Sequence, residues 1–133
     1  MPENKEKTAV GIAVPATEKE DYRINNISEN TEKIKCVIQK PGQISEVSCI
    51  DNTLEEFQSI VGGYIETLTL QGGLILVMNE EGKLKGLEPN IRFYDGYIVG
   101  TVLITVADNN GNFRSLTVQE IQTARAWLIK NTI

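Results

Sequence analysis

The pattern of apolar and polar residues divides the chain into two parts. Residues 1–32 are rich in Glu, Lys, Asn and Thr, and their one apolar patch is VGIAV, from Val10 to Val14. Such a segment buries too little apolar surface to offset the ordering of its backbone, which costs about 1–2 kcal/mol per residue. We therefore predict a flexible arm over 1–32, followed by a single domain over 33–133. In an alternative interpretation, VGIAV adds as a strand to a sheet edge, in this molecule or in a neighbour.

Short apolar runs between turn residues predict the strands of the domain. The expected strands are Ile34–Gln39, Ile44–Ile50, Tyr64–Leu70, Leu74–Met78, Tyr97–Ala107 and a short extended piece at Phe113–Leu116. The run LILVM at 74–78 is apolar throughout, which is typical of a strand covered on both faces. We expect 83–90 to be irregular, because Gly86 and Pro89 interrupt it. Gly100, inside the longest run, indicates a close backbone approach or a bulge.

Capping residues predict two helices. Thr53 with Glu56, and Thr117 with Glu120, have the spacing of a capping box, and Gly62 is suited to end the first helix. Because tight hairpins imply antiparallel pairing, we expect an α+β domain. It would have two layers: a mainly antiparallel sheet of about five to six strands, and two helices on one face.

The last helix has one apolar stripe and one residue outside it. The stripe consists of Val118, Ile121, Ala124 and Leu128. At about 100° per residue, Trp127 points roughly 120° from the stripe centre. It is interpreted either as the margin of a wide apolar face that covers a loop or the arm, or as an interface with a partner or a second subunit.

The two cysteines allow two interpretations. With Gly42 and Gln43 as the hairpin loop, Cys36 lies opposite Cys49, so a cross-strand disulfide is one outcome and two reduced, buried thiols are the other. Two cysteines are too few for a disulfide scaffold or for a zinc site of their own.

Composition narrows the functional classes. The 133-residue chain has a net charge of -5, which argues against broad neutralisation of nucleic-acid phosphates but leaves room for a small anion held by local cations. The chain contains no histidine, which removes the usual general base and the commonest metal ligand. No metal or cofactor is predicted. No apolar run reaches the roughly 18 residues that span a bilayer, and MPENKEK lacks the apolar core of a signal peptide, so we expect a cytoplasmic protein with no membrane partner.

One region is richer in polar residues than folding requires. It contains Tyr64, Glu66, Asn79, Glu80, Glu81, Lys83, Lys85, Asn90, Arg92, Tyr94 and Asp95. Its cations are suited to an anion, with Arg92 able to bind phosphate in a bidentate manner, and its tyrosines are suited to stacking on a ring. The competing interpretation is that these are solvated turns without a ligand. For Arg114 we expect a pair with Glu120 or a bond to a carbonyl group, and a role in ligand binding is the second choice.

Familiar catalytic signatures are missing from the sequence. It has no Walker loop, Rossmann glycine pattern, G-x-S-x-G or histidine-based zinc motif. Glu80 and Glu81 are adjacent and need not converge on one substrate atom, as acid–base catalysis requires.

Several motifs together resemble an uncharacterised family of phages and plasmids of Gram-positive bacteria, described only as a domain of unknown function. They are IKCVIQKPGQ, IDNTLEEFQSIVGGYIE, NEEGKLKGLEPN, YIVGTVLI and FRSLTVQEI, between about Ile34 and Ile121. Where the family often has Asp-Ile-Ile-x-Gly-Thr, this chain has GYIVGT at 96–101. The resemblance implies a mobile-element setting and no catalytic residue. A shared family site would include Tyr64, Glu66, Asn79, Glu81, Lys83 and Asn90.

These observations favour a non-enzymatic binding protein of a phage or plasmid that counters or modulates a host system. Its ligand would be a small anionic, nucleotide-like molecule, bound by Tyr64, Glu66, Asn79, Glu81, Lys83, Asn90 and Arg92. Sequestration by a homo-oligomer would use Trp127 and the arm. The alternatives are an inhibitor that binds a host protein directly, and a small phosphoester hydrolase with a metal held by Glu66, Glu81 and Asp95. A DNA mimic would need a denser negative surface than this charge balance provides.

Overall fold

The computed structural model describes residues 32–133. The arm expected over 1–32, including the strand interpretation of Val10–Val14, therefore lies outside the described residues except for Glu32. The elements are β1 (Lys33–Gln39), β2 (Glu46–Asp51), α1 (Leu54–Val61), β3 (Ile65–Thr69), β4 (Ile75–Asn79), β5 (Pro89–Phe93), β6 (Gly96–Val99), β7 (Val102–Ala107), β8 (Phe113–Arg114) and α2 (Val118–Asn131).

The strands form an antiparallel main sheet and a separate hairpin. The main sheet has six strands in the order β2-β1-β7-β4-β3, with β8 paired to β7, while β5 and β6 form a two-stranded sheet of their own. All strand pairs are antiparallel. The expected α+β class and mainly antiparallel sheet are confirmed.

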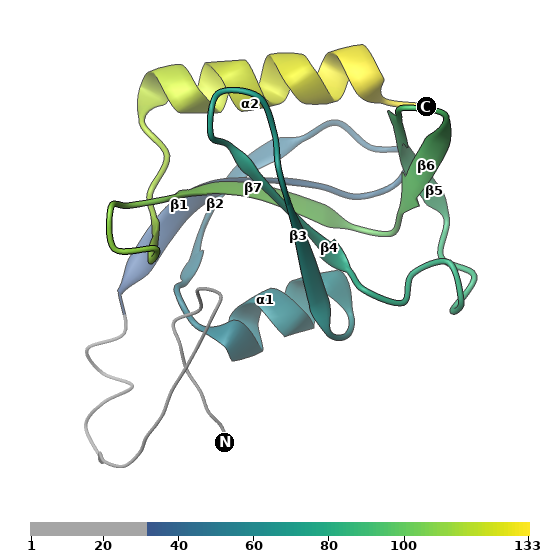
Figure 1. The fold of residues 1–133 in the computed structure, drawn as a ribbon, viewed down its shortest axis with the longest axis horizontal. Coiled ribbons are helices and arrows are strands. Elements are labelled where there is room, and N and C mark those ends of the chain that lie inside the picture. Colours follow the sequence, from purple (N-terminus) through teal and green to yellow (C-terminus); the bar gives the residue numbers. More distant parts are fainter. Residues whose placement is uncertain (1–31) are drawn as a thin grey trace.

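The helices lie on opposite faces of the main sheet, not on one face as expected (Figure 1). Along β7, Leu103 packs with α1 residues such as Phe57, while its neighbour Ile104 packs with Leu128 of α2. Successive side chains of a strand point to opposite faces, so each central strand contributes to two separate cores. The continuously apolar β4 shows the same division, since Val77 faces α1 whereas Leu76 faces α2.

Gly100 interrupts the long strand that was expected over Tyr97–Ala107. Its φ is +82°, a conformation that glycine adopts readily, and the chain leaves the small hairpin at this point to enter β7. A Cβ at Gly100 would lie 2.8 Å from the Leu87 side chain, so the expected close approach is confirmed. Part of the segment expected to be irregular belongs to β5, because Pro89 occupies a strand end, where no ladder hydrogen bond is required of it.

The buried face of α2 is rotated from the predicted stripe. Thr117 and Glu120 form the expected capping box, but Val118 is 72% exposed. The face that packs on the sheet is centred on Ala124 and Leu128, which are fully buried, and it includes Trp127. Because Val118 was counted in the stripe, the predicted centre was displaced away from Trp127. The Trp127 ring instead lies 6.4 Å from that of Phe93 in β5.

The two cysteines are free and do not face each other. In the β1–β2 register Cys36 pairs with Ser48, and Cys49 pairs with Lys35. The hairpin loop is longer than expected, which shifts the register by one residue and sends the two side chains to opposite faces. Cys36 is therefore buried and Cys49 exposed.

A buried polar network joins the main sheet to the small hairpin and to α2. The Asn90 side-chain amide donates to the carbonyl oxygens of Gln39, at 2.9 Å, and Gly100, at 2.8 Å. The Gln39 side-chain amide donates to Asn90 Oδ1 and to Thr132 Oγ1, both at 3.0 Å. These groups bond one another in place of water, so the network fixes where the hairpin sits.

We predict that Asn90→Ala lowers the free energy of unfolding by about 3 kcal/mol, because it leaves buried donors and acceptors without partners. Urea denaturation monitored by circular dichroism measures this change. Asn109→Ala, in the exposed turn after β7, is the matched control and should change stability by less than about 0.5 kcal/mol. Equal effects of the two substitutions would contradict the structural role of Asn90.

Candidate functional site

A cleft opens where the small hairpin meets the end of β4. Its volume is about 270 Å³. We call it the β4–β6 cleft, and its lining residues are Glu66, Met78, Asn79, Glu80, Glu81, Gly82, Lys83, Leu84, Tyr97, Ile98 and Val99. Met78 and Ile98 are buried members of the core on the α2 side, so they give the cleft an apolar floor. Charged side chains from β3 and from the loop after β4 surround that floor.

The cleft brings together part of the predicted ligand-binding set. Glu66, Asn79, Glu81 and Lys83 line it, whereas Tyr64, Asn90 and Arg92 do not. Residues well separated in the sequence meet here because β3 pairs with β4 in a continuous register that places Glu66 opposite Met78. The loop after β4 then turns back over the end of the same strand.

Asn79 lines the cleft, but its side chain is used to hold the scaffold together. It is buried, its amide nitrogen donates to the Val61 carbonyl oxygen at 3.0 Å, and its Oδ1 accepts from the Glu81 N–H at 2.7 Å. Asn79 thus closes the end of α1 and shapes the loop that carries Glu81. A Cβ at Gly63 would lie 2.9 Å from this amide nitrogen, so Gly63 allows the close approach.

Asn90 has no polar atom directed to the cleft, since its amide lies in the buried network described above. Lys85 also serves the scaffold, because its Nζ lies 3.3 Å from the carbonyl oxygen of Gly62 at the C-terminal end of α1. A cation at this end complements the helix dipole. The ionisable side chains that remain directed to the cleft are therefore mainly those of Glu66, Glu80, Glu81 and Lys83.

Tyr97 is a cleft residue that sequence reasoning left out. It was assigned to a long central strand, but the break at Gly100 places it on the small hairpin, where it lines the cleft and is 49% exposed. Arg92 lies directly opposite Tyr97 in the β5–β6 register. Directly opposite residues of an antiparallel pair share a face, so Arg92 flanks Tyr97 outside the cleft lining. Gly100 is the residue in the sequence that indicates this break, and so indicates that Tyr97 belongs to the small hairpin.

The charge of the cleft is negative. Three carboxylates, Glu66, Glu80 and Glu81, line it together with one lysine, Lys83. Carboxylates accept hydrogen bonds, so the arrangement favours a ligand with hydroxyl or amino donors over a bare anion. Within residues 32–133, no group of three or more His, Cys, Asp or Glu side chains is placed to hold a metal ion. Glu66, Glu81 and Asp95 are therefore not gathered as the hydrolase hypothesis requires.

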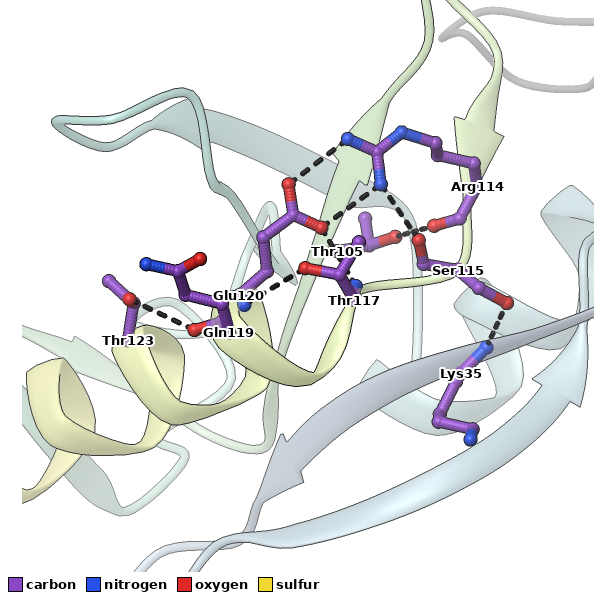
Figure 2. Close-up of polar contacts among 8 residues, drawn as sticks. All are labelled: Lys35, Thr105, Arg114, Ser115, Thr117, Gln119, Glu120 and Thr123. Carbon is purple, nitrogen blue, oxygen red and sulfur yellow. Dashed lines mark hydrogen bonds and ion pairs between the residues drawn. The ribbon is translucent and has the colours of Figure 1, made fainter.

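A second cleft, of about 340 Å³, lies between the Gln71–Gly72 turn and the beginning of α2. Figure 2 shows the polar contacts that fix the beginning of this helix. Arg114 binds both carboxylate oxygens of Glu120 at 3.0 Å and donates to the Ser115 carbonyl oxygen at 2.9 Å. Both roles expected for Arg114 are thus confirmed. The positive charge of Arg114 is thus paired with the carboxylate of Glu120 within the fold.

The bidentate pair lowers the pKa of Glu120 to about 2, chiefly through the hydrogen bond from Arg114 and then through the bond from the Thr117 backbone N–H. The same contact raises the pKa of Arg114. A carboxylate that is already paired in this way is poorly suited to proton transfer near neutral pH. We therefore assign this second cluster to the stability of α2 and keep the β4–β6 cleft as the candidate site.

The described residues define a small α+β domain in which one antiparallel sheet carries a helix on each face. Residues 34–129 match the model of a domain of unknown function, DUF3846, and the chain belongs to this family. A search of curated proteins and a search of solved structures each gave no match. In the described part of the chain, no helix has the length and apolar character needed to cross a membrane.

We predict that Glu120→Gln lowers stability at pH 7 by about 1 kcal/mol, because it weakens the cap and the pair with Arg114. The folded-state pKa of Glu120 lies below the usual glutamate value, so its contribution is complete above that usual value and is lost as the pH falls towards about 2. The difference between wild type and variant should therefore shrink from pH 5 downwards. Urea titrations at several pH values measure it, with Glu46→Gln in β2 as the control. A difference that does not depend on pH would contradict this assignment.

Proposed function

We propose that the domain is a non-enzymatic binding module and that the β4–β6 cleft holds a small, nucleotide-like molecule. The observation that carries the proposal is the convergence of Tyr97, Glu66, Glu81 and Lys83 around an apolar floor. These residues come from three separate segments: β3, the loop after β4, and β6. Ligand sites in proteins combine apolar walls with a few convergent polar groups in this way.

Each part of a nucleotide has a suitable partner in the cleft. A base can stack on the ring of Tyr97, whose edge strand leaves it half exposed. Sugar hydroxyls or an exocyclic amino group can donate to the carboxylates of Glu66 and Glu81, as ribose hydroxyls do to acidic residues in dinucleotide-binding folds. A phosphate is best placed at the mouth, near Lys83 and beside Arg92, away from the carboxylates.

In this arrangement the expected negative charge of the ligand lies only at its phosphate end, at the mouth of the cleft. The acidic lining opposes an anion deep in the cleft, so the nucleoside part supplies most of the binding and the phosphate adds to it at the rim. Inorganic phosphate alone should bind weakly.

The wider role that we propose follows from the resemblance to phage and plasmid proteins. Binding without turnover removes a small molecule from solution, and a mobile element gains from this when the molecule serves a host system.

A second candidate function is direct inhibition of a host protein. The observation in its favour is the exposure of two large side chains, namely Leu84 at 88% in the cleft lining and Tyr94 at 89% in the turn between β5 and β6. Exposed apolar residues beside a cleft are typical of protein contacts as well as of ligand entrances. The two functions differ in which molecule co-purifies with the protein from cells that contain the mobile element.

We predict that adenosine monophosphate binds the full chain more tightly than adenosine in isothermal titration calorimetry, by less than tenfold, while inorganic phosphate does not bind measurably. Tyr97→Ala removes the stacking surface and Glu81→Gln removes a charged acceptor, so each should weaken binding by about tenfold or more. Tyr94→Asn is the matched control, since this tyrosine lies outside the cleft and Asn tolerates its positive φ of 54°.

Two results would overturn the proposal. The first is wild-type protein that binds neither nucleoside nor nucleotide at millimolar concentration. The second is affinity that Tyr97→Ala and Glu81→Gln leave unchanged. Native mass spectrometry of the protein purified from cells carrying the mobile element separates the two candidate functions. A bound small molecule supports ligand capture, and a co-purified host protein without a small molecule supports direct inhibition.

A further inference from the structure

Within residues 32–133, the backbone of β3 is paired along one side only. β3 is the last strand in the order of the main sheet, and among residues 32–133 its partner strand is β4. The Glu80 N–H donates to the Tyr64 carbonyl oxygen, and the Leu70 N–H donates to the Leu74 carbonyl oxygen. Bonded and non-bonded pairs alternate in an antiparallel ladder, so the backbone groups of Ile65, Thr67 and Thr69 point away from β4.

This edge carries one charged residue, Glu66, but lacks other features that commonly prevent strand addition. The sequence of β3, IETLT, contains no Lys and no Pro, and its register with β4 runs without a bulge. Edge strands in soluble proteins commonly carry such features, because an open edge pairs with another strand. The outward backbone groups of β3 are therefore able to pair with a strand of another molecule.

We propose that a second copy of this chain occupies the edge, with β3 of each copy pairing antiparallel about Thr67. In this register Thr67 lies opposite Thr67 of the partner subunit, and all five residues of each strand are paired. The outward N–H and C=O groups of Ile65, Thr67 and Thr69 then bond across the two-fold axis. The main sheet becomes continuous through both subunits.

The register about Thr67 keeps like charges from lying directly opposite each other. Glu66 lies opposite Leu68 of the partner subunit, so no carboxylate faces another, whereas a shift of the centre to Glu66 would set two carboxylates against each other. Threonine pairs across strands stabilise sheets. Tyr64, whose side chain is 66% exposed, lies just before β3 and would face Leu70 of the partner subunit.

The second copy would also extend the β4–β6 cleft. Glu66 lines the cleft, and the residue placed beside it on the same face of the sheet is Leu68 of the partner subunit. The pairing thus adds an apolar wall to the open side of the cleft. Strand pairing of this kind explains the open edge without reference to any ligand, so it does not rest on the function proposed above.

Analytical ultracentrifugation and native mass spectrometry of the full chain, without added ligand, test the proposal. We expect wild-type protein to sediment as a dimer at about 100 μM, a concentration that detects even micromolar association. Thr67→Lys and Thr67→Glu each set like charges opposite one another and should give monomers. An equimolar mixture of the two variants should form a heterodimer, because the opposite charges then face each other at the centre of the register.

Two controls keep the test decisive. Val47→Lys alters β2, at the other edge of the sheet, and should remain dimeric. Thr67 is exposed and its backbone groups face outward, so its variants should keep the circular dichroism spectrum of the wild type and unfold cooperatively, with a melting temperature lowered only by the loss of association. A monomeric wild type, a dimer that survives Thr67→Lys, or a variant mixture that stays monomeric would each overturn the proposal. Because the oligomeric state is measured without ligand, nucleotide binding is judged separately by the Tyr97 and Glu81 variants.

Discussion

The buried contact between Gln39 and Asn90 is the constraint on which the rest of the structure depends. Gln39 ends β1 in the main sheet and Asn90 lies in β5, so their reciprocal amide bonds join two sheets that share no strand pairing. Thr132 brings the end of α2 to the same point. Apolar packing alone would allow the small hairpin to slide over the core, whereas buried amides are satisfied in one arrangement only. That arrangement sets Tyr97 across from the end of β4 and so creates the candidate site.

The residues around the candidate site fall into two groups. Some have side chains that hold the scaffold together, and others have side chains without such a contact. Asn79 closes α1 and holds the loop of Glu81, and Lys85 binds the last turn of the same helix. Glu66 and Lys83 make no such contact among the described residues, and they line the cleft from two different segments. A binding site benefits from rigid neighbours, because less conformational entropy is then lost when a ligand binds. Asn79 and Lys85 thus contribute mainly geometry, and the other charged residues of the cleft are the candidates for contact with a ligand.

Local features were predictable from the sequence, and relations between distant segments were not. The helix caps at Thr53, Gly62 and Thr117 formed as expected, because capping depends on a few consecutive residues, although only Thr117 with Glu120 completes the capping box that was expected at both helices. The helices were placed on one face because their own patterns do not say which side of a sheet they cover. The apolar run of β4 did contain that information, since a strand buried on both faces needs a layer on each. Asn90 resembled a ligand residue because an amide side chain carries no sign of whether its partners lie in the protein or in a ligand.

The different surroundings of the two thiols have a practical consequence. Burial raises the pKa of the Cys36 thiol to about 12, so at neutral pH almost none of it is the reactive thiolate. Cys49 is exposed on β2, at the sheet edge opposite β3. A spin label or fluorophore directed at thiols would therefore attach at one defined position of the native chain, without an engineered cysteine. Because strands lie about 4.8 Å apart, two such labels would be close if subunits met along β2 and several nanometres apart if they met along β3. The distance between two labels at Cys49 therefore distinguishes assembly along β2 from assembly along β3.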